Sequence, residues 1–150
     1  MPSQYHIHIS LPVPADELAR VFATAVNEGS AYWYQDYAPV TDSYESAAGL
    51  PCVRQVKLTQ PVREHCEHCE PATHPNVSVK HLAQAISLTF TNPSICPHTV
   101  REQIASCWPQ VGELDAYTAD ILLQLCVFER IVYGGDDEAD EPPAPMPSDS

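Results

Sequence analysis

The sequence predicts an α+β domain in which a small antiparallel sheet packs against three to four helices. Two kinds of pattern lead to this prediction. Near the N-terminus, apolar residues alternate with polar ones, which is typical of a strand with one buried face. Further along, apolar residues recur at helical spacing over several segments, as on the buried face of an amphipathic helix. The last of these segments is apolar around most of its circumference, which predicts a long, buried C-terminal helix.

The first half of the chain alternates between strand and helix patterns. Residues 4–11 predict a strand whose buried face carries Tyr5, Ile7, Ile9 and Leu11. A helical stripe follows over residues 18–26, and Gly29 is expected to end that helix in the left-handed conformation. The aromatic segment 31–40 and the alternating segment 52–58 predict two further strands. These strands together should form the small sheet.

Two helices are predicted in the second half of the chain before the last one. Residues 79–90 carry an apolar stripe, and Ser78 is well placed to cap its start. Thr99 and Glu102 form a capping-box pattern, which predicts a short helix from there through Trp108. Both helices are expected to pack against the sheet.

The last helix is predicted to span residues 116–133 and to end at Gly134-Gly135. Asp115 is its expected N-cap, with Thr118 as the partner in the first turn. This helix should supply much of the core through Leu122, Leu125, Phe128 and Val132.

The composition limits the class of protein. The chain has 150 residues, 20 Asp or Glu against 7 Lys or Arg, and a formal net charge of −13. This length favours one domain over residues 1–135, and the acidic, proline-rich segment 136–150 is predicted to be a disordered tail.

Broad binding to nucleic-acid backbones needs clustered basic residues, so the negative net charge argues against a protein of that class. No apolar run is long enough for a membrane span and no basic, signal-like segment precedes Arg20, so a cytoplasmic protein is expected.

Three neighbouring aromatic residues are candidate ligand-binding residues. Trp33 lies between Tyr32 and Tyr34 on a predicted strand, so Trp33 would take one face and the two tyrosines the other. Exposed aromatic rings stack on nucleobases or anchor protein interfaces. Burial of these rings under the helices is the alternative interpretation.

Asp120 and Gln124 are polar residues one turn apart on the most apolar helix. If both are buried, they must find hydrogen-bond partners, because an unpaired buried carboxylate is strongly destabilising. Arg54, Arg101 and Arg130 are scarce cations in this acidic chain, so each is expected to partner such a carboxylate or to contact an anion. Asp120, Gln124 and Arg130 therefore join the candidate ligand-binding residues.

The segment HCEHCE is the sharpest local motif. Cys66 and Cys69 have the spacing at which a loop presents two thiolates to zinc, and nearby lie His65, His68 and His74. Cys96 and His98, further along the chain, would supply the second pair of ligands. A zinc ion would hold this proline-rich loop in one shape. The alternative is a set of free thiols in a mobile loop.

Two motifs resemble a family of small bacteriophage accessory proteins of unassigned function. One is the step EGSAYW at residues 28–33, and the other is the ending DAYTADILLQLCVFERIVYG at residues 115–134. The resemblance covers residues 4–58 and 78–134, whereas the HCEHCE loop and the acidic tail depart from the pattern. It implies a phage-encoded accessory protein in the host cytoplasm, and it implies no reaction and no ligand.

No motif selects a reaction, because the chain has no glycine-rich phosphate loop, no HExxH and no recognisable order of a catalytic triad. Whether the protein is an enzyme stays open, and a non-catalytic binder is favoured. The first hypothesis is counter-defence, either by sequestering a small nucleotide-like host signal or by blocking a host defence protein. The alternatives are a zinc-stabilised module on host transcription or replication machinery and an acidic mimic of nucleic acid. A homo-oligomer is compatible with each hypothesis.

Overall fold

The helices and strands of the computed structural model form an α+β fold, which the structure describes for residues 3–5, 10–59 and 71–133. The helices are α1 (Ala15–Thr24), α2 (Ala31–Tyr34), α3 (Val79–Thr91), α4 (His98–Cys107) and α5 (Ala116–Phe128). The shorter helical turns are η1 (Ala25–Gly29), η2 (Gln35–Tyr37), η4 (Pro93–Ile95) and η5 (Val111–Glu113). The strands are β1 (Val40–Glu45), β2 (Pro51–Lys57) and β3 (Asn76–Ser78). The predicted fold class is therefore confirmed.

The strands form one antiparallel sheet in the order β1-β2-β3. Val40 of β1 lies opposite Lys57 of β2, and the β1–β2 register shifts between Asp42 and Ser43, as in a β-bulge. Strand β2 confirms the strand predicted at residues 52–58. Strands β1 and β3 were not predicted. Strand β1 is polar and largely exposed, so it lacks an apolar alternation, and β3 is very short.

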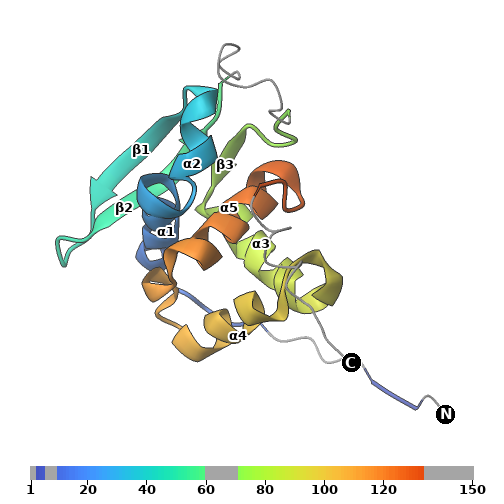
Figure 1. The fold of residues 1–150 in the computed structure, drawn as a ribbon. Helices are drawn as coiled ribbons and strands as arrows, with labels where there is room; N and C mark the ends of the chain where they lie inside the picture. The colour runs from blue at the N-terminus through green and yellow to red at the C-terminus, as the bar shows by residue number, and fades with distance from the viewer. Residues whose placement is uncertain (1–2, 6–9, 60–70, 134–150) are drawn as a thin grey trace, which may run out of the picture.

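Helix α5 runs through the middle of the molecule and contacts both α1 and α3 (Figure 1). Every side chain from Thr118 to Phe128 is buried, which confirms the prediction of a central helix with Leu122, Leu125 and Phe128 in the core. Val132, the fourth residue expected there, lies beyond the helix and is half-buried. Helix α1 covers β2 with an apolar stripe that includes the fully buried Phe22. The core therefore lies between the sheet, α1, α3 and α5.

Two strand predictions near the N-terminus fail in the residues that the structure describes. Tyr5 and Leu11, both expected to be buried, are 73% and 60% exposed, and the described residues around them form no strand. The rest of that predicted strand, residues 6–9, lies outside the described residues. Segment 31–40 is helical as far as Tyr37. The buried side chains of this segment, together with the preceding Ser30, follow helical rather than alternating spacing, at Ser30, Trp33, Tyr34 and Tyr37.

Gly29 is needed for space rather than for an unusual backbone conformation. The predicted left-handed end of the first helix is wrong, because Gly29 has no positive φ. Instead, η1 is a π-helical turn that packs against α5. A Cβ at Gly29 would overlap the carbonyl oxygen of Ala116, the first residue of α5. The absence of a side chain therefore lets η1 approach α5 and brings the neighbouring Ser30 within reach of Asp120.

The starts of α3 and α4 differ in how well the sequence predicts them. Ser78 precedes α3 as expected, and its backbone N–H donates to Nδ1 of His81 over 3.0 Å. Helix α4 begins directly after Pro97, which cannot provide a side-chain cap. The predicted capping box of Thr99 and Glu102 is therefore wrong, because the helix already includes both residues.

Helix α5 starts as predicted but ends early. Oδ1 of Asp115 accepts from the backbone N–H of Thr118 over 2.8 Å, which confirms the N-cap. The helix stops at Phe128 instead of residue 133, because Glu129 takes the left-handed conformation with φ of 64°. The chain then turns back, and residues 131–133 meet the side chain of Gln124.

The acidic tail at 136–150 and the HCEHCE motif both lie outside the described residues, so the tail and the zinc loop stay predictions. Within the described ranges, no helix has both the length and the apolar character that a membrane span requires.

Candidate functional site

Asp120 of α5 is the centre of a buried polar cluster. Its carboxylate, in a residue that is 4% exposed, accepts from Ser30 Oγ over 2.7 Å and from Trp33 Nε1 over 2.9 Å. The hydroxyl of Tyr32 donates to the other carboxylate oxygen over 2.8 Å. Partial burial and the Asp120 carboxylate raise the pKa of Tyr32 above its usual value, so this hydroxyl stays a donor. The cluster joins the start of α2 to the middle of α5.

Gln124, one turn further along α5, is the fourth neutral donor to Asp120. Its Nε2 lies 3.1 Å from both carboxylate oxygens. The same amide holds residues 131–133, a segment that we call the strap. Oε1 accepts from the backbone N–H groups of Val132 and Tyr133 over 2.7 and 2.8 Å, and Nε2 donates to the carbonyl of Tyr133 over 2.9 Å. The predicted pairing of Asp120 with Gln124 is thus present in the structure, and it also fixes the strap.

Aromatic rings hold the strap from a second side. The Tyr133 ring stacks on the Trp33 indole, with ring centroids 5.2 Å apart and an interplanar angle of 8°. The hydroxyls of Tyr37 and Tyr133 are 2.8 Å apart, and the Phe128 ring lies 5.8 Å from that of Tyr133. We call the surface beneath the strap the strap groove, formed by Trp33, Tyr37, Asp120, Gln124 and Phe128. Trp33 is only 2% exposed, so its ring supports the strap and presents no open stacking face.

Three tyrosines lie beside this cluster, and we call them the tyrosine surface: Tyr32, Tyr117 and Tyr133. Tyr32 is 57% exposed, whereas Tyr117 and Tyr133 are half-buried. Tyr117 precedes Asp120 by one helical turn and lies close enough to influence the pKa of Tyr32. Arg130 is exposed and directly precedes the strap. The exposed aromatic residue predicted in this region is therefore Tyr32 and not Trp33.

Tyr34 points away from this surface into the core. It is 6% exposed, and its hydroxyl has no hydrogen-bond partner within the described residues. Burial raises the pKa of Tyr34 to about 12. Its ring meets Trp33 edge-on, so Tyr34 contributes to packing in this cluster.

The other predicted cations lie apart from the polar cluster. Arg54 pairs with Asp42 over 3.3 Å on the exposed surface of the sheet, and its guanidinium lies 4.1 Å from the centre of the Tyr44 ring. Arg101 of α4 donates to the carbonyl of Thr89 over 3.4 Å. Since four neutral donors reach Asp120, hydrogen bonds are what stabilise its buried carboxylate.

The predicted zinc ligands are only partly described. Cys96 is buried, and burial raises the pKa of its thiol while Arg101 partly opposes this shift, so the thiol stays protonated. The imidazole of His98 is 70% exposed and lies 3.8 Å from Glu102. Cys66 and Cys69 lie outside the described residues. In the described parts of the chain, no three metal-ligating side chains gather, so a zinc site remains a prediction that depends on Cys66 and Cys69.

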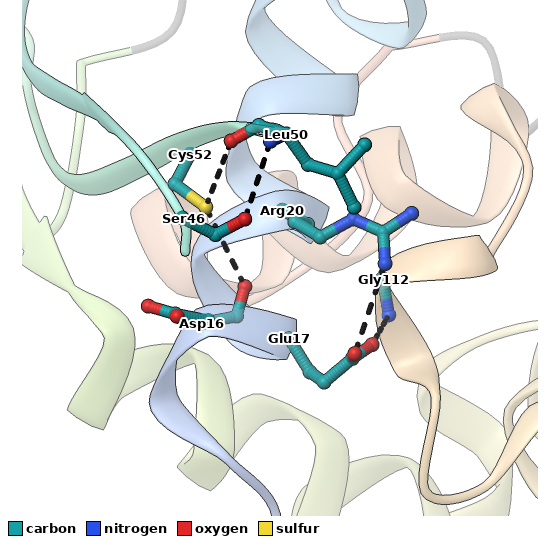
Figure 2. A network of polar contacts seen from close by, with 7 residues as sticks. All are labelled: Asp16, Glu17, Arg20, Ser46, Leu50, Cys52 and Gly112. Carbon is teal, nitrogen blue, oxygen red and sulfur yellow. Dashed lines mark hydrogen bonds and ion pairs between the residues drawn. The ribbon is translucent and has the colours of Figure 1, made fainter. Parts of the chain in front are cut away.

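A small cavity that the sequence did not indicate lies beside α1, near the polar contacts in Figure 2. Its volume is about 110 Å³, and it is lined by Arg20, Ala23, Thr24, Asn27, Glu28, Leu50, Pro51 and Gly112. Glu17 accepts from the backbone N–H of Gly112 over 2.8 Å and lies 3.7 Å from Arg20, which ties α1 to η5. The lining residues come from segments far apart in the chain, so no local motif could reveal them.

Comparisons of the chain with protein-family models, curated proteins and solved structures give no match. The function is therefore inferred from the geometry of the chain's own residues. The resemblance to phage accessory proteins stays a prediction from the two sequence motifs.

Proposed function

We propose that this protein is a phage-type accessory protein that acts in counter-defence by binding and blocking a host protein. The observation that supports the proposal best is Tyr32, the exposed member of the tyrosine surface, whose hydroxyl donates to buried Asp120. Tyrosine is one of the residues that contribute most to protein–protein binding. The proposed phage origin of the protein rests on the EGSAYW step and the C-terminal motif.

Tyr32 is held in place before any partner arrives. Its backbone belongs to α2, and its hydroxyl donates to Asp120 at the far end of the side chain. A side chain fixed at both ends loses little conformational entropy when it is covered by a partner. Tyr32 therefore has the features of a preorganised anchor.

The overall charge favours one kind of partner surface. The chain carries a formal net charge of −13, and cations are scarce throughout its sequence. Complementary charge speeds encounter and disfavours wrong partners. We therefore expect the surface that receives Tyr32 to be basic.

A nucleotide-like ligand has less support than a protein. The Trp33 indole, which would have been the best stacking platform for a base, is covered by Tyr133. The cavity beside α1 has a volume of about 110 Å³, whereas sites for ligands of nucleotide size typically measure roughly 300–1,000 Å³. These two features favour the blocking of a protein over the sequestration of a signal.

The proposal is tested by phage plating on bacteria that carry defined antiviral defence systems. Expression of the chain should raise the plating efficiency of a restricted phage in at least one defence background and leave plating unchanged without defence. Equal plating with and without the chain in every background contradicts the proposal. Native mass spectrometry provides the matching control, because a stoichiometric co-purifying nucleotide whose removal abolishes the effect would favour sequestration instead.

A further inference from the structure

The strap is held in the way that a binding site holds a peptide. The side-chain amide of Gln124 contacts both the N–H and the carbonyl of Tyr133, and it also accepts from the N–H of Val132. These contacts involve only main-chain groups, which every peptide offers. Backbone hydrogen bonds combined with a pocket for one side chain are a common mode of peptide recognition.

The strap groove also provides a pocket for one aromatic side chain. The Tyr133 ring lies flat on Trp33 with 5.2 Å between ring centroids, and its hydroxyl lies 2.8 Å from that of Tyr37. Phe128 contacts the edge of the same ring. A stacked face and a hydroxyl partner at the tip together select tyrosine over an aliphatic side chain.

Residues 131–133 lie in the strap groove although the local sequence pattern favours a longer helix α5. The helical spacing of Leu125, Phe128 and Val132 favours an uninterrupted helix. Instead Glu129 takes a left-handed φ of 64°, a conformation that disfavours a residue with a side chain. The contacts of the strap and the hydrogen bond between Glu129 and His74 together hold this turn in place of a longer helix.

We propose that the strap groove is a peptide-binding site that residues 131–133 occupy within their own chain, and that a partner protein replaces them with a segment of its own that contains a tyrosine. The inference rests on the proposed function in that the partner is a protein, and it names the chemistry of the segment that is recognised: a tyrosine whose own backbone N–H and that of the preceding residue are free to donate to Gln124. The strap then acts as a built-in competitor. Because it is tethered, its effective concentration is on the order of millimolar, so only a segment aided by further contacts displaces it. The neighbouring Tyr32 supplies such a contact.

The test uses the full chain and a synthetic peptide of sequence RIVYGG, which corresponds to residues 130–135. The chain has two tryptophans, so Trp108→Phe leaves Trp33 as the only tryptophan reporter. In this background, Tyr133→Ala removes the ring of the strap from the groove. Peptide added up to about 5 mM should change Trp33 emission and saturate in the Tyr133→Ala chain, and should bind at least about tenfold more weakly to the chain that keeps Tyr133.

Two controls make the peptide result specific. The peptide RIVAGG, which lacks the tyrosine ring, should give no saturable change. Gln124→Leu added to Tyr133→Ala should abolish binding of RIVYGG, because it removes the amide that contacts the peptide backbone. A Tyr133→Ala chain that melts like its parent and shows no response to RIVYGG overturns the inference.

Hydrogen exchange on the unaltered chain covers the case in which Tyr133→Ala does not fold. The amides of Val132 and Tyr133 should exchange faster than those of Leu122 to Leu125, because the groove can be occupied by a partner only if the strap opens without global unfolding. Exchange of the strap amides at the rate of global unfolding overturns the inference. If the peptide does not bind while the chain still relieves a defence system, the peptide-binding inference is wrong and the proposed function is unaffected. If the peptide binds and no defence system is relieved, the peptide-binding inference is supported and the proposed function is wrong.

Discussion

The indole Nε1 of Trp33 donates to the Asp120 carboxylate over 2.9 Å, although 87 residues separate the two in the sequence. This hydrogen bond fixes α2 on α5 and places the Trp33 ring beneath Tyr133. Trp33 therefore supports the proposed binding surface from within the core, and the partly exposed tyrosines beside it belong to that surface.

Trp33→Ala should destabilise the fold as strongly as Phe128→Ala does. Both side chains are at most 3% exposed and contact each other with ring centroids 5.5 Å apart. Each substitution should lower the free energy of unfolding by about 3–5 kcal/mol, through lost burial and the cavity left behind. Urea unfolding followed by circular dichroism measures both. A Trp33→Ala chain as stable as the parent would mean that the ring is not in the core.

Asp120→Ala should lower the free energy of unfolding by about 2–5 kcal/mol, because it leaves the buried donors of Ser30 and Trp33 without an acceptor. Asp42→Ala is the matched control, since this carboxylate is exposed and paired with Arg54. Loss of such a surface pair should change the free energy of unfolding by less than about 1 kcal/mol. Similar effects of the two substitutions would argue against a buried role for Asp120.

Helical periodicity predicts much of this fold from sequence alone. Helices α1, α3 and α5 each present regularly spaced apolar residues, and the Asp115 cap follows from its position before α5. The strand predicted for the aromatic segment 31–40 is wrong because tyrosine and tryptophan favour strands in general, whereas here they lie in a helix. The helical spacing of Ser30, Trp33, Tyr34 and Tyr37 was the signal that could have corrected this prediction.

The candidate site was predictable only in part. The apolar surroundings of Asp120 and Gln124 indicate that the pair is buried, and the structure brings both together with Tyr32 and Trp33. The role of Gln124 toward the strap could not be predicted, because it depends on a helix that ends early at Glu129. A tertiary contact here overrides a local helical pattern, and the sequence near Glu129 carries no glycine that would mark the turn.

Gly29→Ala should destabilise the protein by about 1–3 kcal/mol, because the new Cβ overlaps the carbonyl of Ala116 and forces η1 away from α5. Gly49→Ala provides a comparison in which space is not limiting. Gly49 has a φ of 78° and open surroundings, so its substitution tests backbone strain alone. Only Gly29→Ala should also weaken the Asp120 cluster, which a Trp33 emission shift would report in a Trp108→Phe background. If the two variants show the same Trp33 emission, the close approach of η1 to α5 at Gly29 is contradicted.

Acidification should weaken the start of α5 through Asp115. Partial burial raises the pKa of Asp115, but hydrogen bonds from Gln103 and from the Thr118 N–H outweigh burial, and the pKa lies below its ordinary value. A carboxyl with a depressed folded-state pKa contributes stability that is present above its unfolded pKa and is lost as the pH falls through its folded pKa. The stability of the parent should therefore fall more steeply in acid than that of Asp115→Asn, which keeps an N-capping side chain without the charge. Parallel curves from pH 6 to pH 2 would show that the Asp115 charge contributes nothing.

The most direct test of the proposed binding surface is phage plating with substitutions at Tyr32, in a defence background that the unaltered chain relieves. Tyr32→Ala removes the exposed ring, whereas Tyr32→Phe keeps the ring and removes only the hydroxyl bonded to Asp120. Phe90→Ala is the control, because Phe90 is an exposed ring, 49% accessible, on α3. Loss of relief with Tyr32→Ala, weakened relief with Tyr32→Phe and full relief with Phe90→Ala is the predicted result. A folded Tyr32→Ala chain that relieves the defence as well as the parent does would contradict the account.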